Sequence, residues 1–289
     1  MKVIISRKGF DSSNGGCPSP IFPNGEILSL PIPSRRAATR YADLALAGRN
    51  GGEIVEALTA GRICRNATAH VDPDLDARCL PRRPRWRPAF GQTGRQLSHL
   101  TNRGVTEGDL FLFFGWFNDV VETPDGALRR VPGAPNRHVI FGWLQVGSII
   151  AVGAQPGTAV AANPWLQAHP HVMGTWGLKN SIFVASDALN MPGLPRFQSL
   201  SGGGTFAKIT AARTLSKAGQ PLRSLWSLPS WLSPVHGKAT LSLHEKTSCW
   251  SHVPDSENVL LDSAKIGQEF VLESRDAALL SSWLNKVFE

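Results

Sequence analysis

Two long apolar runs constrain the fold of this chain more than any other feature. They are Leu110–Phe117 (LFLFFGWF) and His138–Gly147 (HVIFGWLQVG). A run with almost no polar positions is typical of a strand that is buried on both faces. Both runs contain Phe-Gly-Trp, and we expect them to pair antiparallel, with Asp125-Gly126 forming a hairpin turn between them.

Short strands and frequent turn signals predict an α+β fold with a mixed, mostly antiparallel sheet. We expect a single domain over residues 1–289. Its last element is predicted to be an amphipathic helix over Asp276–Phe288. Residues 104–150, with a Gly-Asp turn, an apolar strand, a loop and a second glycine-containing strand, resemble the small barrels of PUA-like modules.

Charge and cysteine content indicate the class of partner and the compartment. The formal net charge is +8, which favours nucleic acid or a phosphorylated substrate as the partner. The four cysteines show no C-x-x-C spacing and are expected to be reduced thiols. Because no stretch looks like a signal peptide or a membrane span, we expect a cytoplasmic protein without a membrane partner.

The segment after the first apolar run, Arg7–Gly16 (RKGFDSSNGG), is the strongest candidate for a substrate site. A short strand followed by a polar, glycine-rich loop is a common way to hold an anion. Asp11 is the only acid in the loop and is therefore the expected general base. An ordinary polar turn would use the same residue types. The predicted substrate-binding residues are Arg7, Lys8, Ser12, Ser13, Asn14, Gly15 and Gly16.

A second polar concentration is His70–Asp76 (HVDPDLD). In an extended segment His70, Asp72 and the later acids share one side, so His70 and Asp72 are expected partners of Asp11 in catalysis. We assign no metal ligand, because the motif has no second histidine at ligand spacing and Asp-Pro-Asp is also turn chemistry. The separate pair in His169–His171 is more typical of a surface loop.

Two further titratable residues are candidates for catalysis. His244 follows a strand-like segment, and Glu269 lies inside the apolar strand predicted over Gly267–Leu272. An acid in such a strand is costly unless it is paired. We therefore expect Glu269 to pair with Arg7 or Lys8, or to act in the site.

The most basic run, Arg78–Arg87 (RCLPRRPRWR), suits nucleic acid. Arginine forks match phosphates, and Trp86 could stack on a base; the alternative is a solvated loop with Trp86 in the core. The predicted nucleic-acid contacts are Arg82, Arg83, Arg85, Trp86 and Arg87. Trp116 and Trp143 could form an aromatic wall for a base, although core positions are more common for such residues. Gly203, in a third glycine-rich loop, could allow close backbone approach to a ligand.

Several segments resemble the nucleotide modification associated domain 3 family. They are MKVIISRKGFDSSNGGCPSPIFPNG, HVDPDLD, GDLFLFFGWF, HVIFGWLQVG, LSLHEK and GQEFVLES, spread from Met1 to about Ser274. The resemblance implies a process, nucleotide or DNA modification, with nucleic acid or nucleotides and other modification enzymes as partners. It identifies no reaction and no cofactor. The H-x-E and P-C-x-x-C pattern of zinc deaminases is missing.

Three functions remain open at this stage. An enzyme would bring the three polar loops together in one pocket around a substrate phosphate. A non-catalytic PUA-like reader would use the same loops to shape a groove for a modified base or structured RNA. A globular partner within a modification complex is the third. We favour the enzyme, because three polar loops exceed what a simple reader needs.

Overall fold

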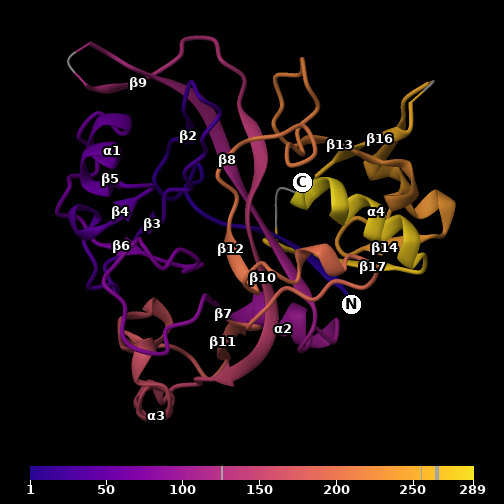
Figure 1. Cartoon of the computed structure of the whole chain (residues 1–289). Helices are drawn as coiled ribbons and strands as arrows, with labels where there is room; N and C mark the ends of the chain where they lie inside the picture. Colours follow the sequence, from indigo (N-terminus) through magenta and orange to yellow (C-terminus); the bar gives the residue numbers. More distant parts are fainter. Residues whose placement is uncertain (125, 255, 264–266) are drawn as a thin grey trace.

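The structure is a computed structural model that describes residues 1–124, 126–254, 256–263 and 267–289 (Figure 1). Its main sheet has the strand order β14-β17-β1-β8-β10-β11-β7. In that order the strands are Ala239–Leu241, Glu269–Ser274, Val3–Arg7, Leu110–Glu122, Arg137–Ala151, Asn180–Ala185 and Ala89–Thr93. β12 (Gly203–Thr205) adds to β10, and β2 (Ser19–Ile21) and β9 (Leu128–Arg130) add to β8.

The expected pairing of the two long apolar strands is confirmed. β8 and β10 are antiparallel, with Trp116 opposite His138 and Leu112 opposite Trp143. The predicted turn lies partly outside the described residues, because Asp125 is not among them. β1 pairs parallel to β8 and antiparallel to β17, so that Val3, Ile4 and Ile5 are fully buried at the centre of the sheet. The sheet is therefore mixed and mostly antiparallel, as predicted.

The remaining elements flank this sheet. The other strands are β3 (Ile32–Pro33), β4 (Ala45–Leu46), β5 (Arg49–Asn50), β6 (Ala69–His70), β13 (Leu225–Pro229), β15 (Trp250–His252) and β16 (Asn258–Asp262). The α-helices are α1 (Gly51–Leu58), α2 (Gly94–Asn102), α3 (Pro156–Ala162) and α4 (Ala277–Phe288). Short 3-10 turns occupy Tyr41–Asp43, Pro164–Ala168, Pro170–Val172, Pro195–Phe197, Ser230–Leu232, Pro234–His236 and Thr247–Cys249.

Figure 1 shows most of these flanking elements on two sides of the long β8–β10 pair. The N-terminal strands β3–β6 and α1 lie on one side, and α4, β13 and β16 lie on the other. The predicted closing helix is confirmed. Asp276 caps α4 by accepting a hydrogen bond from Leu279 N at 3.1 Å, and Trp283, Leu284 and Val287 are buried.

The barrel-like portion expected over residues 104–150 is not supported. Within the described ranges the strand pairings form an open path that begins at β14 and ends at β7, without closure into a barrel. β8 and β10 are long, and β1 and β11 continue the sheet on either side of them. All four cysteines are free thiols. In the part of the chain that the structure describes, no helix combines the length and the apolar character needed to cross a bilayer.

Candidate functional site

A cavity of about 440 Å³ brings together segments that are far apart in the sequence. It is lined by the end of β1 and its loop, by the segment after β3, by β6 and the residues after it, and by β7. The polar and aromatic side chains in the lining are Arg7, Lys8, Asp11, Asn14, Ser34, Arg35, Arg36, His70, Asp72, Gln92, Thr93, His171, Trp176 and Gln268. Asp11, His70 and Asp72, predicted to act together, thus share one cavity.

The Asp11 side chain holds the loop after β1 in place. Asp11 Oδ1 accepts hydrogen bonds from Ser13 N at 2.7 Å and Asn14 N at 2.6 Å, and both carboxylate oxygens face Asn14 Nδ2 at 3.2–3.3 Å. This is the pattern of an Asx turn. The geometry does not support Asp11 as the general base, because its oxygens are engaged within the loop. Asp11 shapes the loop instead.

The two glycines of this loop also serve its conformation. Gly15 has a φ of +87°, and a Cβ there would lie 2.3 Å from the Phe10 ring. Gly16 has a φ of +66° and donates its N–H to Asp11 O at 2.9 Å. Phe10 therefore occupies the space beside Gly15, and the glycine lets the loop pack closely against this ring.

Glu269 pairs with Lys8, as predicted. The Lys8 Nζ to Glu269 Oε1 distance is 2.6 Å, and Gln92 Nε2 donates to the same oxygen at 2.6 Å. The Glu269 side chain is fully buried, and its Oε2 makes no hydrogen bond. The pair joins the residue after β1 to the first residue of β17 and neutralises Lys8, so that Lys8 adds little net charge to the cavity.

Asp72 is the centre of a histidine cluster. Its Oδ1 accepts a hydrogen bond from Gly91 N at 2.7 Å and lies 3.5 Å from His169 Nε2. Its Oδ2 lies 3.7 Å from His70 Nε2 and 3.6 Å from His171 Nε2. The Asp72 side chain is only 4% exposed, and His169 Nε2 is buried without a hydrogen bond. One ligand atom from each of His70, Asp72 and His171 lies within 4.8 Å of the others, a spacing that could hold a metal ion.

The surroundings of His171 fix its orientation. Its Nδ1 lies 2.7 Å from Asn180 Oδ1, and Asn180 Nδ2 donates to His171 O at 2.9 Å. Trp176 stacks on the His171 imidazole with ring centroids 4.4 Å apart, and the Arg36 guanidinium lies 5.1 Å from the Trp176 ring. The 3-10 turn Pro170–Val172 carries His171 against β7 and β11.

The expected surface position of the His169–His171 pair is therefore wrong. Both histidines are buried, at 5% and 3% exposure. Two histidines one residue apart were a weak signal of this cluster in the sequence. It did not indicate Asn180, Trp176 or Gly91, whose roles depend on the antiparallel pairing of β7 with β11.

Burial and neighbouring charges shift the pKa values of this cluster in opposite directions. Burial alone would raise the pKa of Asp72, but contacts with His169 and His70 and the proximity of His171 hold that pKa well below its usual range. Burial lowers the pKa of His171 to about 4, although Asp72 opposes the shift. At neutral pH the cluster is thus an anionic carboxylate beside a neutral imidazole.

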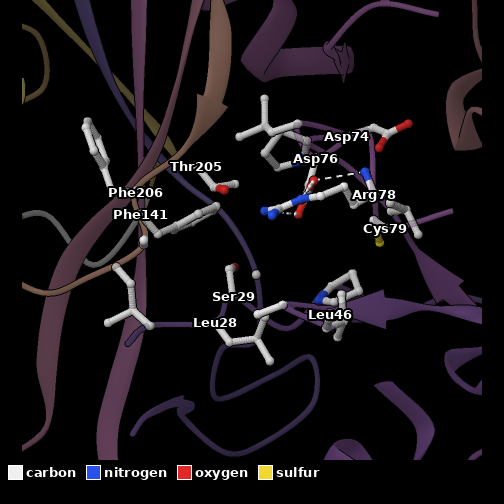
Figure 2. A pocket seen from close by; sticks show the side chains of 18 of the residues that line it. Leu28, Ser29, Leu46, Asp74, Asp76, Arg78, Cys79, Phe141, Thr205 and Phe206 are labelled. Atoms are coloured by element: carbon white, nitrogen blue, oxygen red, sulfur yellow. Dashed lines mark hydrogen bonds and ion pairs between the residues drawn. The ribbon is translucent and has the colours of Figure 1, made fainter. Parts of the chain in front are cut away.

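A second cavity of about 170 Å³, shown in Figure 2, shares Gly9 and Asp72 with the first. Leu28, Phe141 and Phe206 give it apolar walls, and Ser29, Asp76 and Arg78 supply polar groups. In Figure 2 the Arg78 guanidinium is bound to Asp76, with an Nε–Oδ1 distance of 3.1 Å. An apolar cavity with a few polar groups is typical of small-molecule sites.

Trp143, Gly203 and His244 lie away from the cavity of the histidine cluster. Trp143 packs in the core, with ring centroids 4.8 Å from Phe206 and 5.4 Å from Phe288, and cannot form an aromatic wall with Trp116. Gly203 lies in β12, where a Cβ would meet Pro88 at 2.7 Å. His244 is buried against Phe270, with ring centroids 4.7 Å apart, outside the cavity lining that the structure describes.

Trp116 lines a different cavity, together with Ser12, Ser13 and Arg223. The Arg223 guanidinium lies 4.2 Å from the Trp116 ring, and its Nη2 donates to Ser12 Oγ at 3.0 Å. Ser12, Ser13 and Trp116 thus line a different cavity from the histidine cluster. Arg7 lines both cavities.

The basic run is divided between two roles. Arg82 binds both oxygens of Asp74, at 2.7 and 2.6 Å, and its guanidinium lies 4.2 Å from the Trp86 ring. Trp86 Nε1 also donates to Asp74 Oδ2 at 3.1 Å. Arg82 and Trp86 are therefore engaged within the chain. Arg83 and Arg85 are exposed, and Arg87 pairs with Asp187 at 2.7 Å.

Comparison with known proteins assigns the chain to a family. No curated protein and no solved structure matches the chain. Residues 2–273 match the sequence model of the family described as nucleotide modification associated domain 3, so the match includes β1, the loop after it, the histidine cluster and both cavities. The family description connects the chain with nucleotide modification. The chain belongs to the nucleotide modification associated domain 3 family.

Proposed function

We propose that the chain is an enzyme that modifies a phosphate-bearing nucleotide or nucleic acid in the cavity above Asp72. The observation that carries this proposal is the meeting of cationic side chains with the Asp72–histidine cluster in one cavity. Phosphate binding and proton transfer need these two kinds of residue side by side. The family match supports the same class of substrate.

Three arginines in the lining can receive an anion. Arg35 and Arg36 are exposed, and Arg7 is half-buried, with Nη2 donating to Gly267 O at 3.0 Å. The Arg7 Nε is buried without a hydrogen bond. Arginine forks bind phosphate oxygens in a bidentate manner. Arg7, Arg35 and Arg36 therefore supply the substrate contact, while Lys8 is neutralised by Glu269.

The second cavity is suited to the base of the same substrate. Its walls include Phe141 and Phe206, and Asp72 and Gly9 belong to both linings. A nucleotide with its phosphate at Arg35 and Arg36 would extend past Asp72 toward these aromatic rings. Asp72 and His70, with Oδ2 and Nε2 3.7 Å apart, are the proposed catalytic residues at the junction.

Mass spectrometry of nucleosides tests the proposal. The purified full chain is incubated with mononucleotides, with single-stranded DNA and with RNA, and the products are digested and analysed for a mass change. We expect a new nucleoside mass with the wild-type chain and none with Asp72→Asn. The exposed variant Arg129→Gln, in β9, serves as a matched control and should behave as the wild type.

Salt-sensitive binding with every nucleoside mass unchanged would overturn the enzyme proposal and favour a reader. Binding itself is tested with Arg35→Ala/Arg36→Ala, which should weaken affinity for phosphorylated ligands and flatten its dependence on salt. Equal affinity of this variant and the wild type would remove the proposed phosphate contact.

A further inference from the structure

We infer that His70, Asp72 and His171 form a binding site for one divalent transition metal ion. The inference rests on the positions of lone pairs in the cluster and does not depend on the proposed substrate. Two imidazoles and one carboxylate with open positions are the ligand set of many zinc and non-haem iron(II) sites.

Asn180 determines the tautomer of His171. Asn180 Nδ2 donates to His171 O at 2.9 Å, which fixes the amide so that Oδ1 faces the imidazole. Oδ1 is only an acceptor, so His171 Nδ1, 2.7 Å away, must carry the proton and donate it. The neutral ring then has its lone pair on Nε2. That atom points at Asp72 Oδ2, another lone-pair donor, across 3.6 Å.

The Nε2 lone pair of a neutral His171 and Asp72 Oδ2 face each other across 3.6 Å, with space for a metal ion between them. Ligands at 2.0–2.1 Å from a tetrahedral ion are separated by roughly 3.3 Å. The separations of 3.6 and 3.7 Å from Asp72 Oδ2 to the two Nε2 atoms are close to this value. A small inward movement of the side chains would bring all three atoms to bonding distance.

Hydrogen bonds to His171 and Asp72 orient both side chains as ligands. Metal-binding histidines usually donate their other ring N–H to a protein oxygen, as His171 does to Asn180. Gly91 N donates to Asp72 Oδ1 at 2.7 Å, which leaves Oδ2 as the ligand oxygen. Both bonds hold the ligands in place before any ion arrives.

His169 adds an independent observation. Its side chain is 3% exposed, and its Nε2 makes no hydrogen bond although it is aimed at Asp72 Oδ1 from 3.5 Å. Its Nδ1 accepts from His171 N at 3.2 Å, so that in the neutral ring Nε2 carries the proton. His169 is therefore a positioning residue that donates toward the carboxylate, and the three ligands leave a coordination position open to the cavity.

Metal analysis of the purified full chain tests the inference. Elemental mass spectrometry identifies zinc, iron or manganese in the isolated protein, and the metal-free protein is then titrated with Zn²⁺ and Co²⁺. We expect one ion per chain and a Co²⁺ visible spectrum with nitrogen and oxygen ligation. His171→Ala, His70→Ala and Asp72→Asn should each weaken affinity by at least about 100-fold, and His169→Gln by about 10- to 100-fold.

The matched control is His252→Ala, which removes an exposed histidine from β15 and should leave affinity unchanged. Thermal unfolding of each metal-free variant confirms that it is folded. Stoichiometry below one ion, or equal affinity in His252→Ala and Asp72→Asn, would overturn the site. Because no nucleotide is present in this experiment, its failure would leave the proposed substrate class standing. A failure of the nucleoside experiment would likewise leave the metal site standing.

Discussion

Asp72 and Asp74 are separated by one residue, yet they have opposite surroundings. Asp74 has a complete set of donors, with two bonds from the Arg82 guanidinium and one from Trp86 Nε1. Asp72 has one short bond, from Gly91 N, and three imidazole nitrogens at 3.5–3.7 Å. A buried carboxylate with satisfied oxygens stabilises a fold, whereas one that faces uncommitted nitrogens is prepared for a ligand. Within a single segment, Asp74 therefore stabilises the fold, whereas Asp72 belongs to the candidate site.

We expect the largest loss of stability when Arg82, the cation bound to Asp74, is replaced. Arg82→Met leaves the Asp74 carboxylate largely buried without a charged partner, and we expect a loss of about 3 kcal/mol in the free energy of unfolding. Urea denaturation followed by tryptophan fluorescence measures it. Arg83→Met, at the exposed neighbouring position, should change the free energy by less than about 0.5 kcal/mol. Equal losses in the two variants would show that the Arg82–Asp74 contact does not stabilise the fold.

A smaller effect is expected from a matched pair of isosteric substitutions. Asp74→Asn removes the charge that holds Arg82 and should cost about 2 kcal/mol of unfolding free energy while metal affinity is kept. Asp72→Asn should abolish metal binding. It should cost the metal-free chain less unfolding free energy than Asp74→Asn, because Oδ1 can still accept from Gly91 N and no guanidinium loses its partner. Denaturation and Co²⁺ titration of both variants measure the contrast. If both variants lost the same stability and the same affinity, the two aspartates would not differ in role.

Trp86→Phe tests the third donor to Asp74. The ring over Arg82 remains, but the bond from Nε1 at 3.1 Å is lost, and we expect a cost of about 1 kcal/mol. The same denaturation experiment detects it. A loss as large as that of Arg82→Met would mean that packing, rather than the hydrogen bond, is the main contribution of Trp86.

The smallest effect on stability is expected at the exposed arginines of the same run. Arg83→Ala/Arg85→Ala should leave the unfolding free energy unchanged. If these residues contact phosphates, the slope of log affinity for DNA against log salt should become shallower by about 2. Fluorescence anisotropy at several salt concentrations measures the slope. An unchanged slope would remove nucleic-acid binding from the basic run and leave it as a structural loop.

Much of the fold followed from hydrophobic patterning. The β8–β10 pair, the buried β1 and the capped α4 depend on runs of apolar residues that local sequence reveals. The barrel-like portion was not predictable, because the same short strands can form a closed barrel or an open sheet. The choice depends on partners that are distant in sequence, such as β17 beside β1.

The site was predictable only in part, for the same reason. His70, Asp72 and the Lys8–Glu269 pair were recognisable from acids and bases placed beside apolar strands. His171 joins them because β11 pairs with β7 and brings the preceding turn across β6, which no local pattern encodes. Asp11 was predicted to be a base, but its short side chain reaches its own backbone first.

Gly91 is required for the histidine cluster although it is not one of the proposed ligands. A Cβ at this position would lie 2.2 Å from Cδ2 of His171, and the N–H of the same residue holds Asp72. A single added methyl group would evict the imidazole while leaving the ladder of β7 intact, because alanine accepts extended backbone. Gly91, which has no side chain, thus decides whether the ligands can assemble. A Gly91→Ala chain would keep His70, Asp72 and His171 but could not bring them together.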